Sequence, residues 1–129
     1  METHERAGDL KYVRVEREGN VLIVTPLVSF AGFSEAEISG EWKQLQQHLD
    51  DADIKYVVAD LGQIPYLSSI FITWMVLMYK KVRRKGGRLA ACNPELWYEI
   101  IRDTRINPIW RGYDTRAEAI AGLISGTDW

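Results

Sequence analysis

The sequence has a single cysteine and no long apolar run, and each shortage excludes a class of protein. Because Cys92 is the only cysteine, the chain can form neither an internal disulfide nor a cysteine-based zinc site, and a reducing compartment is expected. The longest apolar-dominated stretch, from Ile70 to Tyr79, is about half of the roughly 20 residues that a membrane-spanning helix needs. The start of the chain, METHERAGDL, is polar and charged, unlike a signal peptide. We therefore expect a cytoplasmic protein that does not insert into a membrane.

Basic charge and catalytic motifs are also missing. The net charge is −2, whereas proteins that bind nucleic acid usually carry a clear basic excess, so no nucleic-acid partner is expected. Neither of the two common glycine-rich phosphate-binding loops is present, and there is no G-x-S-x-G nucleophile elbow. The histidines, His4 and His48, do not follow a strand, which is where a general base would be expected. The sequence predicts no enzyme, no cofactor and no metal site.

The sequence does contain a regular alternation of strand and helix patterns. Its 129 residues, 47% of them hydrophobic and 26% charged, fit one globular domain. Alternation of this kind predicts an α/β fold with a mixed, mainly parallel sheet of about five strands, an N-terminal antiparallel hairpin and about four α-helices. We expect the domain over 10–124, between a flexible tail at 1–9 and a C-terminal tail at 125–129. The expected elements are a hairpin over 12–24, helices over 34–50, 68–85, 94–104 and 115–125, and strands over 55–61, 86–93 and 108–113.

Two serines, Ser68 and Ser69, stand directly before the apolar helical run in YLSSIFITW. A serine in this position usually caps the helix by accepting a hydrogen bond from a backbone N–H of the first turn. A helix N-terminus also tolerates a phosphate, because its first N–H groups are unpaired and carry partial positive charge. From the residues alone, Ser68 is predicted as a cap, and a role as a regulatory site stays open.

Three further features have a structural and a functional interpretation. Asp60 ends an apolar strand and is predicted to hydrogen-bond the following turn, and Cys92 is predicted to be a buried apolar residue. The alternative is a small-ligand-binding domain or enzyme that uses these two strand ends. The basic cluster from Lys80 to Arg88 is predicted to be a solvated helix end, with an anion-binding patch as its alternative.

The ordered set of motifs after residue 55 resembles the STAS domain, the module of bacterial anti-sigma factor antagonists. The family typically shows a strand ending in Asp-Leu, then D-S-S-G, an apolar helix, a G-G-R-L-type strand and a Y-D-T-like helix start. The resemblance covers about residues 10 to 124 and is tightest from Tyr56 to Leu123. The counterparts in this chain are Asp60-Leu61, Ser68-Ser69, Gly86-Gly87-Arg88-Leu89 and Tyr113-Asp114-Thr115.

This resemblance implies a STAS-type fold and a non-enzymatic regulatory domain that binds a protein partner. The implied partner is an anti-sigma factor with serine kinase activity, and the implied phosphorylation site is Ser68. The loop and helix start are implied to form the partner-binding surface, which comprises Pro65, Tyr66, Leu67, Ser68, Ser69, Ile70 and Phe71.

Two residues depart from the family pattern. Leu67 stands where the family has Asp, and Ile70 stands where it has Gly. A leucine removes a carboxylate beside the hydroxyl, and an isoleucine blocks the close backbone approach that a glycine permits. These departures favour an alternative, a phosphorylation-independent STAS subunit of a larger assembly. The sequence leaves homo-oligomer formation open.

Overall fold

The computed structural model describes residues 5–6, 10–64, 68–93 and 111–126, and within them it contains one six-stranded sheet. The strands lie in the order β1-β2-β3-β4-β5-β6, so each strand neighbours the next in sequence. Their bounds are β1 Glu5–Arg6, β2 Val13–Glu18, β3 Val21–Pro26, β4 Tyr56–Asp60, β5 Arg88–Cys92 and β6 Arg111–Tyr113.

The sheet is mixed, as the sequence predicts. Strands β2 and β3 form an antiparallel hairpin in which Glu18 pairs with Val21 across a turn at Gly19 and Asn20. Gly19 has a φ of 60°, a conformation that glycine adopts without steric cost. From β3 to β6 all neighbours are parallel, and the connections β3-to-β4 and β4-to-β5 each contain a helix. This confirms the predicted class of a mainly parallel sheet with an N-terminal hairpin.

Three helices lie within the described residues: α1 Glu35–Leu49, α2 Ser69–Arg84 and α4 Arg116–Ser125. The predicted capping box of α1 is present, because Ser34 and Glu37 each accept a hydrogen bond from the other's backbone N–H, at 3.2 and 3.1 Å. Thr115 caps α4 by accepting from Glu118 N–H at 3.2 Å. These local signals are readable from sequence because each lies within four residues.

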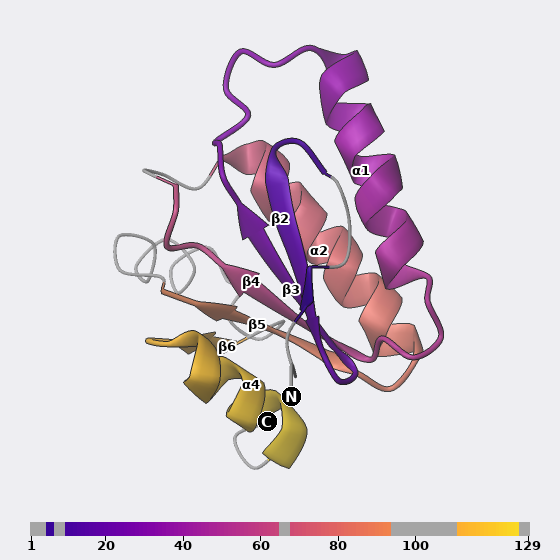
Figure 1. Ribbon diagram of the computed structural model, residues 1–129, viewed down its shortest axis with the longest axis vertical. Coiled ribbons are helices and arrows are strands. Elements are labelled where there is room, and N and C mark those ends of the chain that lie inside the picture. Colours follow the sequence, from indigo (N-terminus) through magenta and orange to yellow (C-terminus); the bar gives the residue numbers. More distant parts are fainter. Residues whose placement is uncertain (1–4, 7–9, 65–67, 94–110, 127–129) are drawn as a thin grey trace.

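The helices lie on both faces of the sheet, and each face has its own apolar core (Figure 1). The larger core, under α1 and α2, contains Val13, Val24, Val57, Leu45 and Met75 among its members. The smaller core lies under α4 and includes Ile23, Val58, Ala119 and Leu123. Alternate residues of each buried strand therefore serve opposite cores, which explains why β3 and β4 read as continuous apolar runs.

Two of the expected segments need separate comment: the stretch from 94 to 113, and the N-terminal tail. The predicted helix over 94–104 and the first half of the predicted strand over 108–113 lie outside the described residues. Glu5 and Arg6, within the segment expected to be a tail, pair with Arg17 and Glu16 of β2 and so form β1. Among the described helices, none has the length and apolar character that would let it cross a bilayer.

Candidate functional site

Ser68 is the N-cap of α2, as the sequence predicts. Its backbone is extended, with φ −77° and ψ 157°, and its Oγ accepts a hydrogen bond from Phe71 N–H at 3.3 Å. The first backbone hydrogen bond of the helix runs from Ile72 N–H to the Ser68 carbonyl at 3.0 Å. The hydroxyl is therefore held at the point where the helix begins.

Exposure varies along the first turn of α2. Ser68 and Ile70 are half-buried, and Ser69 is exposed. Phe71 is only 1% exposed, so its side chain supports the helix start from inside and does not form part of the surface. Pro65, Tyr66 and Leu67, the other residues implied as partner-binding, lie outside the described residues. The surface that can be placed here consists of Ser68, Ser69 and Ile70.

The two ends of α2 differ in charge. The first turn carries no acidic side chain, whereas the last turn carries Lys81, Arg83 and Arg84. The first N–H groups of a helix have no carbonyl partner within the helix, and the macrodipole makes that end partly positive. The N-terminus of α2 is thus an environment in which an added negative charge on the Ser68 hydroxyl would be tolerated by the fold.

Aromatic side chains fix α2 against the rest of the domain. Trp74 contacts Phe30 and Trp42 with ring centroids 4.9 and 5.4 Å apart, and Phe71 lies 6.1 Å from the same Trp74 ring. Phe30 is buried and has a φ of 68°, which is a strained backbone conformation for a bulky residue. Contacts of this kind hold the helix start in one position relative to the sheet.

Asp60, at the end of β4, is occupied by structural hydrogen bonds. Its Oδ1 accepts from Gly62 N–H at 3.1 Å, which confirms the predicted bond to the following turn, and from Asn93 Nδ2 at 2.9 Å. Its Oδ2 accepts from Nε and Nη2 of Arg116, at 3.2 and 3.0 Å. Arg116 also forms an ion pair with Glu16 at 3.2 Å, so it joins α4 to β2 and β4.

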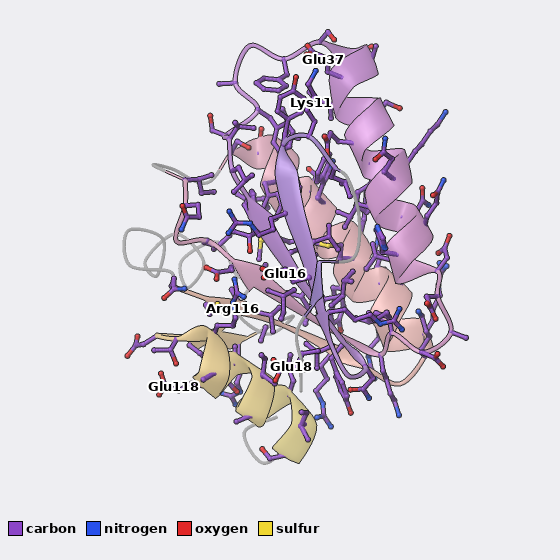
Figure 2. All side chains as sticks on the ribbon, in the orientation of Figure 1. Lys11, Glu16, Glu18, Glu37, Arg116 and Glu118 are labelled. Carbon is purple, nitrogen blue, oxygen red and sulfur yellow. The ribbon has the colours of Figure 1, made fainter. Side chains whose placement is uncertain are left out.

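The role of Arg116 was not predicted from the sequence. It lies 56 residues from Asp60, and only the parallel packing of strands beneath α4 brings the two together. The sequence did indicate where Arg116 lies in its helix, because the cap at Thr115 places Arg116 in the first turn of α4. It did not indicate the partner of Arg116. Figure 2 shows Arg116 and Glu16 near one another beside the sheet.

Cys92, the other strand-end residue considered, is fully buried, as predicted. Burial, and secondly the nearby Asp60 carboxylate, raise the pKa of its thiol to about 12. The thiol therefore stays protonated at neutral pH and is a poor nucleophile. Within the part of the chain that the structure describes, no group of three or more His, Cys, Asp or Glu side chains could hold a metal ion.

Two lysines of the basic cluster contact the C-terminal end of α1. Lys85 Nζ donates to the carbonyls of Leu49, Asp51 and Ile54, at 2.5, 3.0 and 2.9 Å. Lys81 forms an ion pair with Asp50 at 2.7 Å, whereas Arg83 and Arg84 are exposed. The cluster was predicted to be a solvated helix end, and the structure adds a packing role for Lys81 and Lys85.

Comparisons with known proteins identify relatives of this fold. The family model of the STAS domain matches residues 12–119. A search of curated protein sequences found no match.

Three solved structures illustrate the similarity. A match to an anti-sigma-factor antagonist (STAS) domain protein from Planctomyces limnophilus has 24% identity and a TM-score of 0.71, and covers 87% of this chain and 97% of that one. An anti-sigma factor antagonist from Mycobacterium paratuberculosis gives 18% identity and a TM-score of 0.66, with 87% and 92% covered. The Bacillus cell fate determinant SpoIIAA in its phosphorylated form has 10% identity and a TM-score of 0.62. That match covers 84% of this chain and 96% of the SpoIIAA chain. At these identities the similarity shows a shared fold.

Proposed function

The chain belongs to the STAS domain family, and from this membership we propose that it is a non-enzymatic regulator whose partner protein binds at the start of α2. The proposed partner is an anti-sigma factor with serine kinase activity, which would place the protein in the control of transcription in the cytoplasm of a bacterium. Phosphorylation of Ser68 is proposed to switch this interaction.

The observation that carries the proposal is the position of Ser68. Its hydroxyl lies at the surface end of a helix, next to exposed Ser69 and half-buried Ile70. A phosphate here would add about −1.5 to −2 charges to a surface whose neighbouring side chains are neutral. A partner that buries Ile70 and its surroundings would then have to desolvate that charge, which costs binding free energy.

The fold itself would change little on phosphorylation. The phosphate would lie at the N-terminus of α2, where backbone N–H groups and the helix dipole stabilise an anion. The aromatic contacts of Trp74 lie on the buried side of the helix and would be unaffected. Supporting precedent comes from the fold relative SpoIIAA, whose structure has been determined in a phosphorylated form.

Phosphate mapping tests the proposal. The protein, its Ser68→Ala variant and its Ser69→Ala variant are incubated with ATP and a serine kinase that is isolated with the protein from its native cell, and the modified residue is located by mass spectrometry. We expect one phosphate on Ser68, no phosphate on Ser68→Ala, and unchanged modification of Ser69→Ala. Modification at Ser69 in place of Ser68, or none under conditions in which the kinase modifies another substrate, would refute the switch.

A second candidate is a STAS subunit that binds its partners without phosphorylation. It is favoured by Leu67 and Ile70, which replace the family's Asp and Gly beside the serine pair. Ile70 is half-buried and packs partly against the core, whereas the family's glycine would leave the helix backbone open to a partner. Mass spectrometry of the protein from its native cell separates the two candidates, because this one predicts that Ser68 is unmodified under every growth condition.

A further inference from the structure

One side of α2 is exposed along the whole length of the helix. The opposite side, which includes Trp74, Met75 and Met78, packs into the larger core. At a rise of about 1.5 Å per residue, the exposed side is about 22 Å long, and it begins beside Ser68. Its exposed positions recur at helical spacing, and we call them the outer stripe: Ser69, Thr73, Leu77, Lys80 and Arg84.

The cations at the basic end of α2 are of two kinds. Lys81 and Lys85 bond to the C-terminal end of α1. Lys80, Arg83 and Arg84 are exposed, and none of them forms an ion pair or a side-chain hydrogen bond with another described residue. The helix contains no Asp or Glu that could balance them. The outer side of α2 therefore carries positive charge that the described part of the chain does not neutralise.

The middle of the outer stripe is apolar. Leu77 is 37% exposed and is one of only two large hydrophobic side chains exposed among the described residues. Thr73 Oγ1 donates to the Ser69 carbonyl at 2.9 Å, so this hydroxyl is satisfied within the helix and needs no further acceptor. A single exposed leucine is ordinary, but this one lies within one turn of Lys80. The stripe thus combines an apolar contact with adjacent unpaired cations.

This combination favours a protein segment over two other kinds of partner. A nucleic acid is disfavoured, because the whole chain has a net charge of −2 and the stripe could neutralise few phosphates. A lipid surface is disfavoured, because a helix that lies in a membrane interface inserts its apolar face, and the apolar face of α2 is buried in the core. The complement of the stripe is an apolar side chain followed by carboxylates.

We propose that the partner protein binds along the outer stripe of α2 through an acidic, amphipathic segment. An apolar side chain of that segment packs on Leu77, and its carboxylates pair with Lys80 and Arg84. This inference rests on the proposed function, because it extends the same interface from Ser68 along the helix. Exposed complementary charges act mainly on the association rate and its salt dependence. The basic end of α2 therefore attracts the partner, whereas Ser68 controls its release.

Photo-crosslinking in the native cell tests where the partner lies. The photoreactive residue p-benzoylphenylalanine is placed singly at Ser69, Leu77 or Lys43, and the crosslinked peptides are sequenced by mass spectrometry. Lys43 is the control, because it is exposed on α1. We expect the probes at Ser69 and Leu77 to capture the same protein, the latter through a segment rich in Asp and Glu, and the probe at Lys43 to capture neither.

The other outcomes of the crosslinking separate this inference from the proposed function. Capture from Ser69 but not from Leu77 would overturn the stripe and leave the proposed function standing. Capture from Leu77 of a second copy of this chain, of a lipid or of a segment without acidic residues would also overturn the stripe. Capture from neither position would overturn both proposals.

Charge reversal measures the contribution of the stripe to affinity for the captured protein. We expect Lys80→Glu to weaken binding about fivefold or more at low salt and by less at high salt, because salt screens exposed charges. The matched control Lys43→Glu makes the same change in charge on α1 and should stay within about twofold. Leu77→Ala should weaken binding about threefold at both salt concentrations, because its contact is apolar.

The fold should tolerate the charge reversal. A glutamate at position 80 lies one turn before Arg84, which is a favourable spacing for an ion pair, so Tm should change by less than about 3 °C. Equal losses of affinity in Lys80→Glu and Lys43→Glu would overturn the stripe. So would native affinity of Lys80→Glu, and in that case weaker binding of Ser68→Asp would show that the proposed function still holds.

Discussion

At Ser68, one hydroxyl caps a helix and is also the site at which we propose a modification. Its Oγ accepts from Phe71 N–H, and its side chain is half-buried rather than enclosed. A cap needs only an acceptor oxygen, so a carboxylate or a phosphate at this position could also serve. The two roles are therefore compatible in the same residue, and substitutions can separate them.

Ser68→Ala and Ser68→Asp should differ in stability. Alanine removes the acceptor, and we expect the free energy of unfolding to fall by about 1 kcal/mol. Aspartate is an equally good N-cap and adds a favourable charge–dipole interaction, so its variant should be as stable as the unmodified chain. Urea unfolding of the three proteins measures this. An equal loss in both variants would show that the hydroxyl itself, and not an acceptor, is required.

Cys92 provides a prediction for pH dependence. Its pKa is raised from 9.0 to about 12 in the folded chain, so the unfolded state loses the thiol proton first as pH rises. The stability associated with the neutral thiol is complete below pH 9 and is lost between pH 9 and 12, with a slope of at most about 1.4 kcal/mol per pH unit. We expect unfolding free energies at pH 8 and pH 10.5 to diverge more for the native chain than for Cys92→Ala. Equal pH dependence would contradict the burial argument.

Some residues could be assigned from the sequence and others could not, for a physical reason. Ser68 and Asp60 were predicted because each acts on backbone within three residues of itself. Glu41 and Arg116 were not, because their partners lie about 30 and 56 residues away. Nothing in a polar stretch of helix distinguishes Glu41 from an exposed glutamate until the start of β2 is placed beside it.

At the scale of elements, the end of α2 shows how the glycine pair in KGGRL shapes the fold. Gly86 has a φ of 80°, and its N–H donates to the Arg83 carbonyl while Gly87 N–H donates to Val82. This arrangement is the Schellman motif that commonly ends a helix. It directs the chain into β5 beside Lys55.

Alanine substitutions at two glycines should have opposite effects. A Cβ at Gly87 would overlap the backbone carbonyl of Lys55, and we expect Gly87→Ala to destabilise the fold by about 2 kcal/mol or more. Gly40→Ala meets no atom within 4 Å and should stabilise it by about 0.5–1 kcal/mol. Thermal unfolding compares the two. A Gly87→Ala variant of native stability would show that β5 can shift away from Lys55.

Element boundaries were predictable where a local signal marks them. The starts of α1, α2 and α4 coincide with Ser34, Ser68 and Thr115, each of which caps its helix. Strand β1 carried no signal, because two residues have no periodicity. It exists through pairing with the outer edge of β2, a long-range contact that composition does not encode.

For the whole molecule, the alternation of strands and helices predicts the class of fold but not its internal bonds. It gives a mainly parallel sheet covered on both faces, as observed (Figure 1). The ion pairs that Arg116 of α4 forms with Asp60 and Glu16 of the sheet could be identified only from the structure. In this arrangement α1 and α2 share one face, so the start of α2 lies on the face of the sheet opposite α4.

The central claim is that the start of α2 is a docking surface that a negative charge at Ser68 closes. The most direct test uses a partner protein that co-purifies with the chain from its native cell. Its dissociation constant is measured for the unmodified chain, for Ser68→Asp and for Ser39→Asp. Ser39→Asp is the control, because it adds the same charge at an exposed site on α1. We predict that Ser68→Asp weakens binding by about tenfold or more and that Ser39→Asp changes it by less than about threefold. Equal affinity of Ser68→Asp and the unmodified chain would contradict the account.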